Sequence, residues 1–212
     1  MRRDRVQGMV ELAECHDLYL ISDECYEKIV FDGAHVSPAS LGAGDRCFTV
    51  GSFSKSYAMT GWRLGYGIFP EPLVPHIVKL SANSVSCAAT FTQRAALQAL
   101  EGPQDRVVAM TQEFKARRDL IAKGLREIPG VTCPDPEGAF YAFPSIRGTG
   151  MTSAEFEDRA LEAGVALLSG TGFGEYGEGY VRLSYATSQD NITLALGRLK
   201  NMVGAQRGVG GS

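Results

Sequence analysis

Lys55 lies in a stretch of small and hydroxylated residues that reads Gly51-Ser-Phe-Ser-Lys-Ser-Tyr-Ala-Met-Thr-Gly-Trp-Arg-Leu-Gly65. A lysine where a strand gives way to a loop can form a Schiff base with an aldehyde once its pKa is lowered. Hydroxyls and an arginine nearby, here Ser52, Ser54 and Arg63, are the groups that bind a phosphate monoester. Together these groups suggest pyridoxal phosphate as a cofactor. For any single lysine, a loop residue near a solvated arginine is the commoner alternative.

Asp23 is the second candidate, because it follows the continuous apolar run at residues 18–21. Such a run predicts a strand of a parallel sheet that is buried on both faces, and ligands of such sheets lie at the carboxyl ends of strands. A carboxylate beside a pyridine nitrogen keeps that nitrogen protonated, so that the ring withdraws electrons. Tyr26 would then hydrogen-bond the ring hydroxyl. A solvated aspartate and a half-buried tyrosine are the alternative that the residues alone leave open.

Arg182 is the third candidate and lies in an alternating run at residues 180–184. The alternation predicts a strand on which Arg182 shares a face with Tyr180 and Ser184. An arginine fork binds a carboxylate through two hydrogen bonds, and an amino acid carries such a group. The alternative is an exposed strand arginine that forms a surface ion pair.

The segments that hold these candidates resemble the motifs of class I aminotransferases of fold type I. The resemblance runs from about residue 6 to residue 202 and includes Ile21-Ser-Asp-Glu-Cys-Tyr-Glu27, the Lys55 stretch, Gly138-Ala-Phe-Tyr141 and Gly179-Tyr-Val-Arg-Leu-Ser-Tyr185. It implies an enzyme that transfers an amino group between an amino acid and a 2-oxo acid with pyridoxal 5'-phosphate. The roles it implies are catalysis by Lys55, cofactor binding by Asp23, Tyr26, Ser52, Ser54, Lys55 and Arg63, and substrate binding by Arg182.

Members of that family are roughly twice as long as this chain, and the part without a counterpart here is N-terminal. That part supplies another phosphate-binding turn, the aromatic residue that stacks on the cofactor and an asparagine that binds the ring hydroxyl. We therefore expect a truncated chain that is weakly active or inactive alone, and a homodimer in the complete protein. A carbon–sulfur lyase or synthase of the same fold, or a non-catalytic remnant, is the alternative.

The expected fold is α/β. The resemblance implies the C-terminal portion of a large, mainly parallel sheet domain at 1–115, a smaller α+β domain at 116–205 and a frayed tail at 206–212. The patterns predict strands at 18–21, 47–50, 66–69, 138–143, 165–168 and 180–184. They predict helices at 6–16, 73–80, 90–100, 104–128, 189–203 and, capped by Ser153, at 153–163.

Composition narrows the function classes. Hydrophobic residues make up 44% of the 212 residues and the net charge is −3, which is ordinary for a globular protein and too small to indicate nucleic acid or a membrane surface. The five cysteines are widely spaced, so neither a metal site nor a disulfide framework is predicted. No secretory signal is recognised, and we expect a cytoplasmic protein. The G-x-G-x-x-G match at 172–177 is rejected, because a strand follows it where a dinucleotide site needs a helix.

Overall fold

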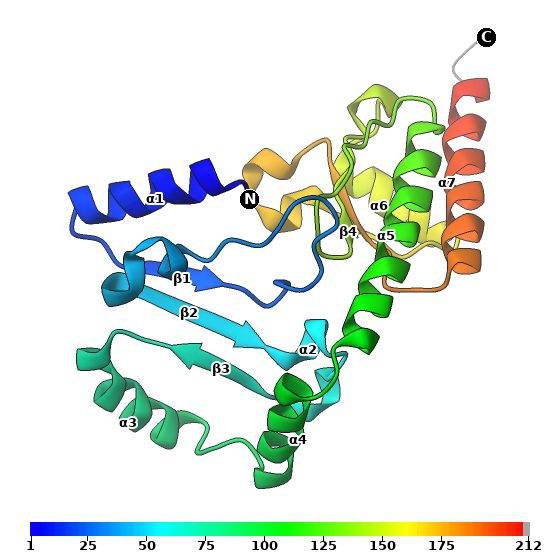
Figure 1. The fold of residues 1–212 in the computed structure, drawn as a ribbon. Coiled ribbons are helices and arrows are strands. Elements are labelled where there is room, and N and C mark those ends of the chain that lie inside the picture. Colours follow the sequence, from blue (N-terminus) through cyan, green and yellow to red (C-terminus); the bar gives the residue numbers. More distant parts are fainter. Residues whose placement is uncertain (210–212) are drawn as a thin grey trace. The chain divides into compact units, whose positions relative to one another are not determined.

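The computed structural model describes residues 1–209, which form two compact units, one from Met1 to Ala109 and one from Met110 onward. The first unit contains a three-stranded sheet in the order β1-β2-β3 (Figure 1). Strand β1 (Leu20–Asp23) is parallel to β2 (Cys47–Ser52), and β3 (Gly65–Ile68) is antiparallel to β2. The carboxyl ends of β1 and β2 therefore lie at the same edge of the sheet, where β3 begins.

Helix α1 (Arg3–Cys15) begins three residues before the predicted start and buries Val6, Val10 and Ala13. Their spacing places them on one side of the helix. Val10 packs with Cys47 of β2 in a small core, which covers one face of the sheet.

The prediction that the first strand is buried on both faces is wrong for the described structure. Ile21 is 79% exposed, and every residue of β3 is exposed. The strand also starts later than predicted, because residues 17 and 18 close the preceding helix. Asp17 has a φ of 49°, and the Leu18 amide donates to the Ala13 carbonyl at 2.8 Å.

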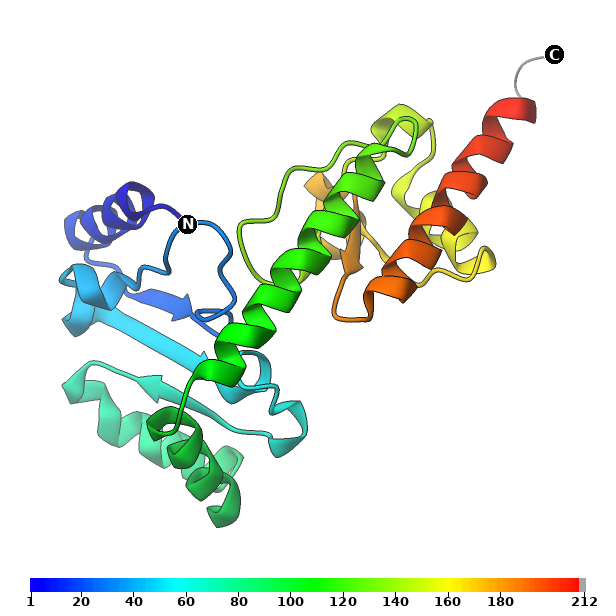
Figure 2. The same cartoon turned by 45° about the vertical axis from the view of Figure 1, so that its right-hand side comes forward.

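Helices α2 to α5 come between β2 and the second sheet in the described residues. The short α2 (Phe53–Ser56) directly follows β2, and the sequence patterns did not predict it. Helix α3 (Val74–Ser84) lies beside β3 and runs past its predicted end (Figure 1, Figure 2). Helix α4 (Thr90–Glu101) agrees with its prediction to within one residue, and α5 (Asp105–Arg126) to within two.

The second unit contains an antiparallel sheet in the order β4-β6-β5, built from β4 (Tyr141–Ala142), β6 (Val181–Ser184) and β5 (Leu168–Ser169). In the central strand β6, Val181 and Leu183 are buried while Arg182 and Ser184 are less so, which confirms the predicted alternation. Helix α6 (Ser153–Glu162) packs against the sheet.

Helix α7 (Gln189–Val209) runs along α5 (Figure 2). The two approach so closely at Gly124 that a Cβ there would overlap Leu196. The helix continues past its predicted end at residue 203, and the last part of the predicted tail, 210–212, lies outside the described residues.

Ser153 does not cap α6, which corrects the prediction. Thr152 is the N-cap, and it exchanges hydrogen bonds with Glu155 in a capping box. The Ser153 hydroxyl is fully buried instead and accepts the amide protons of Gly179 and Tyr180 at 2.8 and 3.2 Å. It therefore fixes the chain just before β6.

The glycine-rich match at 172–177 forms two short 3-10 turns, Gly170–Phe173 and Glu175–Gly177, and leads into a strand. This agrees with its interpretation as a turn. Across residues 1–209, no helix combines the length and the apolar character that crossing a membrane requires. The same residues contain no cluster of three or more potential metal ligands.

Candidate functional site

A pocket at the carboxyl ends of β1 and β2 brings together five of the predicted residues. Its lining includes Asp23, Ser52, Ser54, Lys55 and Arg63. The register of the sheet explains this, because Asp23 is level with Val50 in β2 and Ser52 is level with Gly65 in β3. Residues that are 40 positions apart in the sequence thus meet at one edge.

The lysine is positioned by a change from strand to helix. Ser52 ends β2 and caps α2, because its hydroxyl accepts the Ser54 amide proton at 3.1 Å. Phe53 anchors this turn in the core: it is 3% exposed, and its ring lies 5.4 Å from the ring of Tyr57 and 5.7 Å from that of Tyr66. The buried Phe53 leaves Ser54 and Lys55 on the pocket side of α2.

Two backbone features shape the pocket wall. A Cβ at residue 51 would overlap the Tyr66 ring, so Gly51 permits the close approach of β3. Arg63 adopts the left-handed region with a φ of 50°, and its Nη1 donates to the Thr60 carbonyl at 2.9 Å. A non-glycine residue in that region costs of the order of 1 kcal/mol and often marks a functional site.

Thr60 also lines the pocket and was not predicted, although its hydroxyl three residues before Arg63 was a signal.

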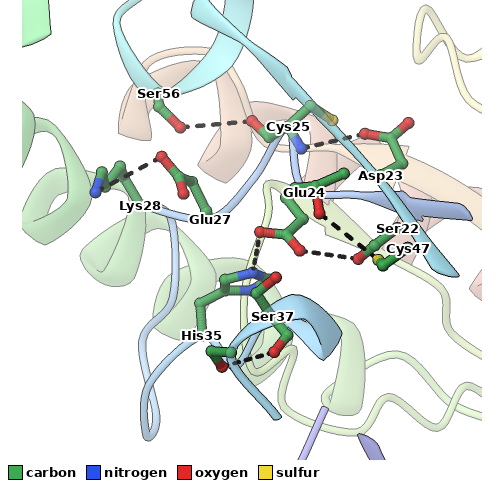
Figure 3. A network of polar contacts seen from close by, with 12 residues as sticks. Ser22, Asp23, Glu24, Cys25, Glu27, Lys28, His35, Ser37, Cys47 and Ser56 are labelled. Carbon is green, nitrogen blue, oxygen red and sulfur yellow. Dashed lines mark hydrogen bonds and ion pairs between the residues drawn. The ribbon is translucent and has the colours of Figure 1, made fainter. Parts of the chain in front are cut away.

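Asp23 is held by the turn that follows β1. One carboxylate oxygen accepts the Cys25 amide proton at 3.1 Å, and the carbonyl of Cys25 accepts the hydroxyl proton of the buried Ser56 at 3.4 Å (Figure 3). Cys25 thus connects the aspartate to α2, where Ser56 follows Lys55. No sequence pattern had indicated this connection.

Cys25 lines the pocket as well. Burial raises the pKa of its thiol to about 11, and the nearby Asp23 carboxylate adds to the increase. The thiol is therefore protonated at neutral pH, which argues against a nucleophilic cysteine.

A second polar cluster, the Glu24 network, lies beside Asp23 (Figure 3). Glu24 is 7% exposed, and its carboxylate bonds the Ser22 hydroxyl and the His35 ring, each at 2.9 Å. Burial raises the pKa of this carboxyl, but hydrogen bonds with Ser37, His35 and Ser22 outweigh it and leave the pKa below its usual value. The network connects the end of β1 to residues 35–37. Its contact between His35 and Glu24 joins residues that are 11 positions apart, so no local sequence pattern predicts it.

Tyr26 and Arg182 do not line this pocket. Tyr26 is half-buried in the turn after β1, and its contact with a ring hydroxyl stays a prediction. Arg182 belongs to the second unit, where its Cζ lies 4.6 Å from the Tyr141 ring centroid and 4.3 Å from that of Phe173. The sequence had indicated neither ring as a neighbour of the arginine.

The pocket's donor set fits pyridoxal phosphate. It offers a carboxylate for the pyridinium, an amine for the aldehyde, and hydroxyls with a guanidinium for the phosphate. Among the described residues that line it, Lys55 and Arg63 outweigh the charge of Asp23, which suits an anionic ligand.

Comparison with known proteins gives a consistent result. A family model described as aminotransferase class I and II matches residues 1–199. The chain is 42% identical over 206 residues to a probable aspartate aminotransferase of Methanocaldococcus jannaschii, which covers 94% of this chain and 54% of that protein. It is 41% identical to aromatic-amino-acid aminotransferase 2 of Thermococcus litoralis, over 93% of this chain and 52% of that one.

Among solved structures, the aromatic aminotransferase from Pyrococcus horikoshii OT3 superposes with a TM-score of 0.94 at 40% identity, covering 98% of this chain and 57% of that one. The predicted fold class is thereby confirmed. The chain spans about half the length of the curated relatives it matches.

Proposed function

The chain belongs to the class I and II aminotransferases, and from this we propose that it carries the lysine-bearing part of a pyridoxal-phosphate-dependent transaminase. The reaction would move an amino group between an amino acid and a 2-oxo acid. The observation that supports this proposal is the meeting of Asp23, Ser52, Ser54, Lys55 and Arg63 in one pocket.

Each of these pocket residues has its own task in the proposed reaction. Pyridoxal phosphate, when bound, supplies a ring that withdraws electrons from the substrate Cα. The Lys55 amine would hold the cofactor aldehyde and, once the substrate amine has displaced it, would move a proton to and from Cα. Asp23 would keep the proton on the ring nitrogen, while Ser52, Ser54 and Arg63 would donate hydrogen bonds to the phosphate.

Two further residues act outside the pocket lining. Tyr26 would donate a hydrogen bond to the ring hydroxyl. Arg182 would bind the α-carboxylate of the amino acid through its guanidinium fork. The relatives are named for aspartate, aromatic amino acids and, in one case, arginine with pyruvate, so the proposal commits to the substrate class and not to one amino acid. We also propose a homodimer for the complete protein and action in the cytoplasm.

Reductive labelling tests the cofactor assignment directly. Pyridoxal phosphate is added to the chain, borohydride fixes any imine, and a peptide map locates the label. We expect the label on Lys55 and its disappearance in Lys55→Arg, while Lys79→Arg in α3 serves as the matched control and keeps it. Label spread equally over surface lysines, with Lys55 unmodified, would reject the assignment.

A further inference from the structure

Resting on the proposed role of Arg182, we propose that Phe173 and Tyr141 are positioning residues that hold its guanidinium for carboxylate binding. Both rings lie within cation–π range of the arginine, with 4.3 Å from Cζ to the Phe173 centroid and 4.6 Å to that of Tyr141. Neither ring needs to touch the substrate in order to act, because each acts through the arginine.

The two rings reach Arg182 from the two flanks of its strand. Strand β6 lies between β4 and β5, so Arg182 has a neighbouring strand on each side. Tyr141 belongs to β4 and pairs with Ser184, which faces the same way as Arg182. Phe173 ends the 3-10 turn Gly170–Phe173, which directly follows β5. The guanidinium is thereby restrained from both sides of the strand.

Further rings support Phe173. Phe143 lies edge-on to it, with centroids 6.0 Å apart and planes at 84°. Phe143 in turn stacks on Tyr180, with centroids 5.5 Å apart and planes at 9°. Phe173 thus belongs to a row of aromatic side chains, which limits where its ring can move.

The two rings determine which part of the Arg182 guanidinium can bind a ligand. A guanidinium attracts aromatic rings to its flat faces and donates its hydrogen bonds only in its own plane. With Cζ over both rings, the proposed arrangement places the rings against these faces and leaves the in-plane edge for a ligand, and that edge matches a carboxylate in the two-bond geometry. Restraining the side chain beforehand also reduces the entropy that ligand binding would otherwise lose.

A purely structural role for Phe173 fits the structure less well. Its side chain is 50% exposed, so it adds little to the core of the second unit. Tyr141, by contrast, also packs on Phe140 with centroids 4.9 Å apart, so its replacement would disturb more than the arginine. Phe173 is therefore the better residue to vary.

The test is a double-mutant cycle with the inert dicarboxylate succinate as the probe. Its affinity is measured by NMR titration of the 212-residue chain, and the Nε–Hε signal of Arg182 reports the mobility of the guanidinium. We expect Phe173→Leu to weaken succinate binding by about three- to five-fold, as expected for the loss of an exposed cation–π contact. Phe173→Leu should also broaden or shift the arginine signal, and Phe173→Tyr should restore both readouts.

Two comparisons make the outcome decisive. In an Arg182→Leu background, Phe173→Leu should change nothing further. The matched control is Phe91→Leu, which removes another exposed ring, one that lies 6.2 Å from the Trp62 ring in the first unit, and should leave succinate binding as it is. Loss of binding in Arg182→Leu but not in Phe173→Leu would overturn this inference alone. Unchanged binding in Arg182→Leu would overturn the proposed carboxylate role together with it.

Discussion

The lysine pocket and the arginine face are positioned by different kinds of interaction. Around Lys55, position is set by the backbone and by short polar contacts: the Ser52 cap, the left-handed Arg63 and the Asp23–Cys25 hydrogen bond. Around Arg182, position is set by aromatic rings on one face of a sheet. The first kind fixes atoms through hydrogen bonds with defined directions, whereas the second restrains a cation through contacts with ring faces, which have no single preferred direction.

The two sites should also differ in how much each loses when one side chain is replaced. Polar contacts fail when a single donor or acceptor is lost, because the partner is then left unsatisfied. A cation held by several aromatic rings loses its restraint gradually as rings are removed, because each ring contributes only a small part of the interaction energy. Variants at the two sites and in the turns that carry them should show this difference.

Gly177→Ala should have the largest effect on stability. A Cβ at Gly177 would overlap the carbonyl of Gly170, and neither backbone can move without opening the turn that carries Phe173. We expect a loss of about 3 kcal/mol in the free energy of unfolding, near the upper end of the usual range for overpacking. Urea unfolding measures it. Gly172→Ala in the same turn region is the control, because a Cβ there has nothing within 4 Å. Equal midpoints for the two variants would contradict this account of the turn.

Arg182→Lys should have the next largest effect, on binding and not on folding. An ammonium cannot form the in-plane pair of hydrogen bonds that a guanidinium offers a carboxylate. We expect the affinity for succinate to fall by on the order of 1.5–3 kcal/mol, measured by titration. Arg147→Lys is the matched control, because Arg147 also lies over a ring, 5.0 Å from the Tyr180 centroid. The idea fails if the two substitutions weaken succinate binding equally.

The part of this structure that sequence predicts is the part built from neighbours in the chain. The spacing from Ser52 to Arg63 and the strand that ends at Asp23 indicated one shared pocket, because parallel strands align their carboxyl ends, and the family resemblance favoured this over a solvated lysine and aspartate. The helices with a clear apolar period were found for the same reason. Local spacing therefore indicated the pocket and predicted the helices.

Tertiary neighbours were not predictable in this way. His35 reaches Glu24 across 11 residues, and Phe173 reaches Arg182 from a turn after another strand. The exposed Ile21 shows the reverse case, because an apolar run indicates a capacity for burial and not the partner that covers it. Contacts of this kind depend on how the elements pack, which a single sequence does not reveal.

Glu24→Gln should have a smaller effect that depends on pH. The folded chain lowers the pKa of this carboxyl, so its contribution to stability is full above the unfolded value of about 4.3 and disappears as the pH falls through the folded value. At pH 7 we expect Glu24→Gln to cost about 1.5 kcal/mol, the lower end of the range for hydrogen bonds to a charged group, because glutamine keeps one acceptor oxygen. Below pH 4 the difference from the wild type should shrink. Urea unfolding from pH 3 to pH 7 measures it, with the exposed Glu101→Gln as control, and a pH-independent difference would contradict the charge-based explanation.

The smallest expected effect concerns Cys25 and tests how close the Asp23 carboxylate lies. With a pKa of about 11, the Cys25 thiol should react with iodoacetamide at pH 8 far more slowly than the exposed Cys15 and Cys87, because only the thiolate reacts. Burial is the larger cause of the raised pKa and the carboxylate the smaller one. Asp23→Asn should therefore speed alkylation of Cys25 only several-fold and leave it slower than the two exposed cysteines. Mass spectrometry of timed samples gives all three rates at once, with Asp45→Asn as the matched control. An unchanged Cys25 rate in Asp23→Asn would mean that the carboxylate is not held beside the thiol, and the turn that positions Asp23 would then need another explanation.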